Sequence, residues 1–168
     1  KAGEEVARFL FKREERRIWF LDGTEEYGKA VWQGMQKIFS KKGCCLEEEQ
    51  YLEIPKDRDL RRMFYKIRLA GLALSADMLV FASAVQGAEA VGYLHDLEIK
   101  VPEEIEVIAV GKEETALICR PQLTTVEFDK KRLVRQAIEE LYVQIIKGYI
   151  LTKSGKISVK TIIRGSCN

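Results

Sequence analysis

Short apolar runs alternate with helical patterns along most of this chain, and this alternation restricts its fold more than any other feature. The apolar runs are five or six residues long and cover 17–21, 78–82 and 105–110. Such runs are typical of parallel strands with both faces covered. Apolar residues at helical spacing precede and separate these runs, over 2–12, 25–41, 58–73 and 84–97. This order predicts an α/β fold with a doubly wound parallel sheet.

A less regular segment precedes the third of these helices. Residues 44–54 place a few apolar side chains among glutamates, which predicts an edge or partly exposed strand that Pro55 closes. Asp57 is positioned to cap the helix that follows, and Gly43 offers a stop to the helix before.

The stretch from Ile99 to Val126 indicates where a ligand would bind. Gly111 ends its apolar run, and acidic residues follow directly. A second strand is then entered through Pro121. In open α/β sheets, ligands bind just outside the carboxyl ends of the strands. The loop after residue 110 is therefore expected at the edge of a binding site.

The character of the chain changes after Val126. Asp129 is positioned to cap a strongly amphipathic helix over 130–147, and Gly148 ends it. Two β-type runs follow, Tyr149 to Thr152 and Ile157 to Ile163, with a turn at Ser154-Gly155. This tail predicts a hairpin or a returning strand.

Composition excludes several classes of function. A net charge of +2 does not support a nucleic-acid-binding surface across the whole chain. No apolar run is long enough to cross a bilayer, so no membrane partner is expected. The four cysteines form no CxxC pair, which argues against a zinc site and fits a reducing cytoplasm. The chain opens directly on a helical pattern without a secretory signal, so we expect residues before Lys1 in the natural protein.

Catalysis is not expected. The lone His95 has no serine or cysteine elbow nearby, and no GxGxxG or P-loop follows any strand. Adjacent acids such as Glu103 and Glu104 face apart and do not form a catalytic pair. We expect neither a cofactor nor a metal ion.

Several segments, in order, resemble the effector-binding core of the LacI/GalR family of bacterial transcription regulators. Arg16 to Leu21 resembles the family's "rrIafi" strand, and Met78 to Val91 its "aifa.nD..A.g.l" strand and helix. Pro121 to Val126 resembles "PpLTTv", and the tail from Ile163 to Ser166 resembles "l..R.S". The last two matches are the most specific, and the resemblance covers nearly the whole chain.

This resemblance implies a periplasmic-binding-protein-like core of two α/β subdomains with a small effector in the cleft between them. Residues 1–122 would form the C-terminal subdomain, and residues 123–168 a crossover strand, a helix of the first subdomain and returning strands. The expected partners are a sugar-like effector and a second copy in a homodimer. DNA would be bound only by a head outside this chain, either the family's own or a GntR-type one.

The resemblance and the strand-end positions together give the candidate effector-binding residues Thr24, Tyr27, Ser83 and Glu113. Glu113 occupies the position of the effector-contacting Asp in the family's "GfDd", with one methylene more. Ser83 and Ala84 replace the Asn and Asp of "nD", and Val31 replaces a common effector-binding Arg. Simpler roles also fit, namely a solvated acid for Glu113 and local backbone contacts for Ser83 and Tyr27.

Two other classes of function share this pattern. A solute-binding protein for sugar transport has the same fold but needs a secretory signal. An interaction module that has lost ligand binding would explain the changes at Val31, Ser83 and Ala84. In each case the apolar face of the 130–147 helix needs a cover, so we expect it to pair with another copy or to fold back on the sheet.

Overall fold

The computed structural model describes residues 1–13, 17–24, 26–111, 114–148 and 158–167, and it contains one six-stranded sheet. The strands follow the order β2-β1-β3-β4-β5-β6. All neighbours are parallel except β6, which runs antiparallel to β5. The strands are β1 Ile18–Asp22, β2 Tyr51–Glu53, β3 Met78–Phe81, β4 Glu106–Val110, β5 Thr124–Phe128 and β6 Val159–Ile162. The predicted parallel sheet is confirmed, with an antiparallel strand added at one edge.

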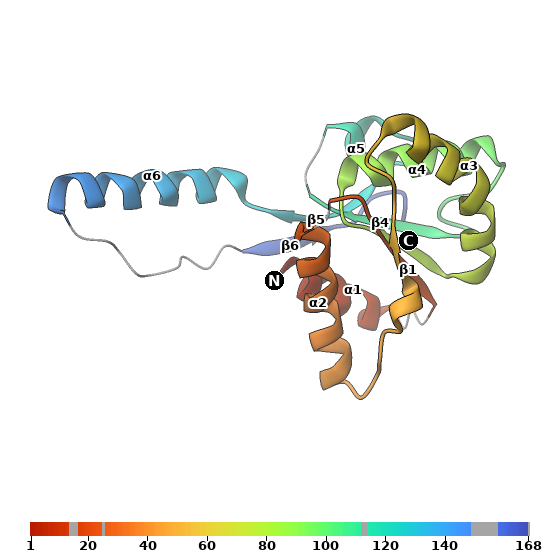
Figure 1. The fold of residues 1–168 in the computed structure, drawn as a ribbon, viewed down its shortest axis with the longest axis horizontal. Coiled ribbons are helices and arrows are strands. Elements are labelled where there is room, and N and C mark those ends of the chain that lie inside the picture. Colours follow the sequence, from red (N-terminus) through yellow and green to blue (C-terminus); the bar gives the residue numbers. More distant parts are fainter. Residues whose placement is uncertain (14–16, 25, 112–113, 149–157, 168) are drawn as a thin grey trace.

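Helices cover both faces of this sheet, as expected of a doubly wound fold (Figure 1). α1 and α2 lie on one face, and α3, α4 and α5 lie on the other. The helices are α1 Ala2–Lys12, α2 Glu26–Lys41, α3 Arg58–Ser75, α4 Ala84–Asp96, α5 Thr115–Ile118 and α6 Lys130–Lys147, with a short 3-10 helix η1 at Glu48–Gln50.

Alternating strand side chains build a separate apolar core on each face. In β1, Phe20 packs with α1 and α2, whereas its neighbour Leu21 packs with α3 and α4. In β3, Val80 and Phe81 divide in the same way. Successive strand residues point to opposite faces, so a strand covered on both sides is apolar at most of its positions. This is the physical origin of the apolar runs in the sequence.

The predicted helix ends are confirmed by their local contacts. The Asp57 carboxylate accepts hydrogen bonds from the amides of Asp59 and Leu60, both at 3.0 Å, and so caps α3. Asp129 caps α6 through the amide of Arg132 at 3.0 Å. Gly148 ends α6 with a φ of 66°, a left-handed conformation that favours glycine.

Two segments differ from their predictions. The expected strand over 44–54 is reduced to β2, because Gln50 accepts a hydrogen bond from the amide of Glu47 and stabilises η1. The short helix α5 was not predicted, since one helical turn has no visible period. The returning strand is confirmed as β6, whereas the run 149–152 and the turn at Ser154-Gly155 lie outside the described residues.

Arg164, in the tail after β6, binds to β5 and to the residue before it. The Arg164 guanidinium donates to the Leu123 carbonyl at 2.8 Å, to the Thr125 hydroxyl at 2.6 Å and to the Glu127 carboxylate at 2.8 Å. Both charged side chains of the Arg164–Glu127 pair are largely buried. The two segments that resemble the family most specifically are therefore bound to each other in space.

α6 projects away from the rest of the molecule (Figure 1). Its apolar side chains are exposed, so of the two expected covers, folding back on the sheet is wrong. The exposed set is Leu133, Val134, Ile138, Leu141, Tyr142, Ile145 and Ile146, and we call it the α6 face. Among the described residues, no helix combines the length and apolarity needed to cross a bilayer.

Candidate functional site

The loops that carry most of the predicted site residues meet at one edge of the sheet. β1 ends at Asp22, β3 leads into Ser83, and β4 leads into Gly111. The register continues past the strands, since the Ala82 amide donates to the Leu21 carbonyl at 3.0 Å and the Gly111 amide to the Val126 carbonyl at 2.9 Å. Parallel strands place their carboxyl ends together, so this edge is the expected position of a ligand.

Asp22 organises this edge, although the sequence did not single it out. Its buried carboxylate accepts hydrogen bonds from the amide of Thr24 at 2.6 Å and from the Thr24 hydroxyl at 2.7 Å. It also accepts one from the Tyr51 hydroxyl at 2.6 Å, which ties β1 to β2. Burial raises the pKa of Tyr51, and the bond to Asp22 adds to this effect. Thr24 is thereby held in place and keeps its oxygen available as an acceptor.

Two glycines allow this close arrangement. A Cβ on Gly28 would lie 1.9 Å from the Asp22 carboxyl carbon, well inside van der Waals contact. A Cβ on Gly23 would lie 2.2 Å from Nε2 of Gln86. The backbone at Gly28 can therefore approach the Asp22 carboxylate, and the backbone at Gly23 the Gln86 amide, because neither position carries a side chain.

Ser83 lies at the amino end of α4, as its predicted site requires. It occupies the N-cap position with extended backbone, but its hydroxyl makes no capping hydrogen bond. Only its carbonyl bonds to the helix, accepting from the Gly87 amide at 3.0 Å. The half-buried hydroxyl has no partner among the described residues and can both donate to and accept from a ligand.

Tyr27 and Glu113 are the other two predicted site residues. Tyr27 is in the first turn of α2 and 43% exposed, and its hydroxyl has no partner among the described residues. Partial burial raises the pKa of Tyr27 above its ordinary value. Glu113 lies outside the described residues, and its role stays a prediction.

Gln86 is a candidate that sequence reasoning missed. It lies in the first turn of α4, and its buried side chain lies against Gly23. Its Oε1 atom has no hydrogen-bond partner among the described residues. A buried amide oxygen without a donor is costly, and a ligand hydroxyl would satisfy it. Sequence offered no signal, because a single glutamine on a helix is ordinary.

Val31, predicted to stand where the resembling family commonly has an effector-binding Arg, is part of the apolar core. Its side chain is 3% exposed and lies in the apolar core between α1, α2 and the sheet. Ala84 is equally buried, on the other face. Neither supplies a polar group to the strand ends. Among the described residues, no group of three or more His, Cys, Asp or Glu side chains is placed to hold a metal ion.

The sequence matches the model of the periplasmic binding protein-like domain over residues 7–167. This chain belongs to that family. The resemblance to the effector-binding cores of LacI/GalR regulators is thus confirmed at the level of domain family and fold. No curated protein sequence matches the chain significantly.

Solved structures of transcription regulators have the same fold as this periplasmic binding protein-like domain. The CcpA regulator of Lactococcus lactis aligns with a TM-score of 0.81 at 16% identity, over 99% of this chain and 61% of its own. The Escherichia coli repressor ascG gives 0.80 at 19% identity, over 98% and 60%. The regulator CelR in complex with cellobiose gives 0.82 at 20% identity, over 98% and 51%. This chain therefore spans between half and two thirds of the length of these structures.

Proposed function

We propose that this chain is the effector-binding part of a LacI-type transcription regulator and that it senses a small sugar-like molecule. The observation that carries this proposal is the set of unsatisfied polar groups at the strand ends. The Ser83 hydroxyl and Gln86 Oε1 have no partners among the described residues, and Thr24 keeps acceptor capacity. The cellobiose complex of CelR, which shares the fold, supports a carbohydrate as the ligand class.

These groups suit hydroxyls rather than charges. A sugar hydroxyl can donate to Gln86 Oε1 and accept from the Ser83 hydroxyl, because every hydroxyl has both capacities. Leaving such a buried acceptor unpaired disfavours ligands that lack the hydroxyl. Thr24, fixed by Asp22, would add a contact from the neighbouring strand.

The regulatory step requires parts beyond this chain. Effector binding would change the cleft between two subdomains, and a DNA-binding head outside the chain would respond, in the cytoplasm. In this proposal residues 1–122 are the C-terminal subdomain, and 123–168 cross to the first subdomain and return. The exposed α6 face supports this division, because such a face needs a partner. Homodimerisation is part of the same proposal.

Isothermal titration calorimetry against a library of neutral sugars tests the sensing role. At least one sugar should bind, and Ser83→Ala and Gln86→Leu should each weaken it about tenfold, the cost of one lost hydrogen bond of about 1.4 kcal/mol. Ser40→Ala, on the exposed face of α2, is the control and should leave binding unchanged. Failure of every sugar to bind the full-length regulator would contradict the proposal.

A second candidate is an interaction module that has lost ligand binding. The observation in its favour is the apolar burial of Val31 and Ala84, where the resembling family has polar side chains. In that case no sugar would bind, while association through the α6 face would persist. The same calorimetry, combined with sedimentation, separates the two candidates.

A further inference from the structure

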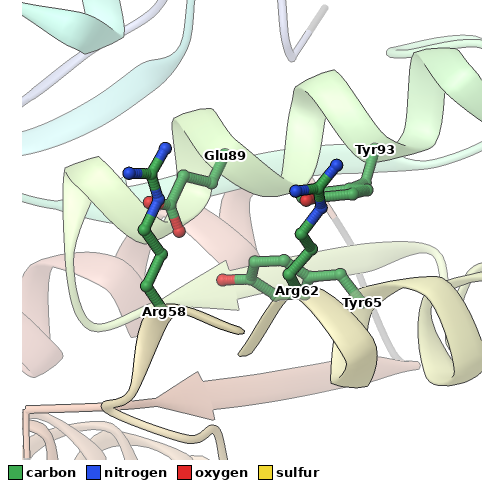
Figure 2. A pocket seen from close by; sticks show the side chains of 5 residues that line it. All are labelled: Arg58, Arg62, Tyr65, Glu89 and Tyr93. Atoms are coloured by element: carbon green, nitrogen blue, oxygen red, sulfur yellow. The ribbon is translucent and has the colours of Figure 1, made fainter. Parts of the chain in front are cut away.

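A hollow of about 300 Å³ lies between α3 and α4, on the helical layer (Figure 2). It is lined by Arg58, Arg62, Tyr65, Glu89 and Tyr93. None of these residues is among the candidate effector-binding residues Thr24, Ser83 and Gln86. The hollow is therefore a separate feature, which the proposed sensing role does not explain.

Two arginines of the hollow carry unbalanced charge. Arg58 and Arg62 are one helical turn apart on α3, and their guanidinium groups stand on the same side of the helix (Figure 2). Both residues are exposed, and neither has a hydrogen bond or ion pair with any other described residue. Two like charges at this spacing repel each other, so a bound anion would relieve them.

The one carboxylate of the hollow is already neutralised. Glu89 accepts from Nε of Arg61 at 2.8 Å and from its Nη2 at 3.3 Å. Arg61 is fixed further by donating to the carbonyl of Lys56 at 2.7 Å. The Asp57 carboxylate near the start of α3 is directed to the helix amides it caps. The charges of Arg58 and Arg62 thus remain available to a ligand.

Two tyrosines complete the hollow. Tyr65 is fully buried and donates its hydroxyl to the Gln86 carbonyl at 3.2 Å. Its ring lies 5.4 Å from that of Tyr93, measured between centroids. Tyr93 is half-buried, and its hydroxyl has no partner among the described residues, so it is a third donor beside the two guanidinium groups.

We propose that this hollow binds the phosphate group of a small phosphate ester. A phosphate carries nearly two charges and three acceptor oxygens, which match two guanidinium forks and one phenol. A single carboxylate would balance only one of the arginines. The volume is at the lower limit for ligand pockets, so the ester is small, and its carbon atoms would contact the tyrosine rings.

Calorimetry at fixed ionic strength tests this site, with glycerol 3-phosphate, inorganic phosphate and glycerol as probes. Glycerol 3-phosphate should bind at least as tightly as inorganic phosphate, and glycerol should not bind. Arg58→Gln and Arg62→Gln should each weaken phosphate binding at least tenfold. Their unfolding temperatures should not fall, since neither arginine has a hydrogen bond or ion pair with another described residue. Arg68→Gln removes an exposed arginine of α3 outside the hollow and should leave affinity unchanged.

Two further variants define the chemistry. Arg58→Lys combined with Arg62→Lys keeps both charges but loses the forks, so its affinity should fall between those of the protein and of the glutamine variants. Ser83→Ala should leave phosphate binding intact, which separates this site from the proposed effector site. Absence of phosphate binding, or an equal loss in Arg68→Gln, would overturn the proposal.

Discussion

The buried hydroxyl of Ser166 accepts a hydrogen bond of 2.7 Å from the backbone amide of Thr124, across 42 positions of sequence. The same hydroxyl donates to the Val107 carbonyl at 2.6 Å. The backbone of Ser166 adds a bond to the Gln122 carbonyl at 2.9 Å and one from the Val107 amide at 3.0 Å. One serine near the C-terminus therefore joins the beginnings of β4 and β5.

Replacing this serine should destabilise the fold. Ser166→Ala leaves the buried Thr124 amide without its partner, and the Val107 carbonyl keeps only the bond from the Cys167 thiol at 3.3 Å. We expect a loss of about 1–3 kcal/mol in the free energy of unfolding, measured by urea denaturation. Ser40→Ala on the surface of α2 should change it by less than about 0.5 kcal/mol. Equal stability of the two variants would contradict this role of Ser166.

Two glycine-to-alanine substitutions in helices should have opposite effects. Gly28→Ala forces a methyl group against the Asp22 carboxylate and should cost about 1–3 kcal/mol of stability. Gly71→Ala on α3 places its methyl group in open space and should stabilise by about 0.5–1 kcal/mol, because alanine favours the helix. Thermal unfolding of both variants checks the difference. A stable Gly28→Ala would show that Asp22 can move.

Stability should fall in alkaline solution partly through Cys167. Burial raises the pKa of its thiol to about 12. Between about pH 9 and pH 12 the unfolded thiol loses its proton while the folded one keeps it, so the unfolded state binds fewer protons. The free energy of unfolding should therefore decrease as pH rises through this range. Urea titrations at a series of pH values should give a shallower decrease for Cys167→Ala.

The exposed Cys44 gives the matched control for this pH effect. Cys44→Ala removes a thiol that is exposed in the folded state, so the pH dependence of stability should match that of the unaltered protein. A thiol reagent at pH 8 should likewise modify Cys44 before Cys167. Rapid modification of Cys167 in the folded protein would contradict its burial.

The α6 face should drive self-association of this chain. Ile145→Glu places a charge on a side chain that is 73% exposed, so it should dissociate the assembly without lowering the free energy of unfolding of the sheet domain. Leu74→Glu, at an 86% exposed position on α3, is the control and should leave the assembly intact. Analytical ultracentrifugation distinguishes these outcomes, and a monomeric unaltered chain would refute the prediction.

Sequence by itself determined the order and most of the limits of the elements. Asp57, Asp129 and Gly148 act within one turn of their own helix, so their effects are local and visible in the sequence. The apolar runs were equally informative, because burial on both faces leaves few polar positions in a strand. The spacing of apolar residues over 130–147 also identified α6 as an amphipathic helix. It did not indicate that this helix projects from the molecule.

Only the tertiary structure decided which polar groups meet. Asp22 and Tyr51 lie 29 residues apart, and their bond depends on the parallel register of β1 and β2. The burial of Gln86 against Gly23, with its Oε1 unpaired, depends on how the start of α4 packs on the loop after β1. The hollow beside Arg58 depends on how α3 packs on α4. Such contacts are set by the packing of distant segments, and no local period in the sequence encodes them.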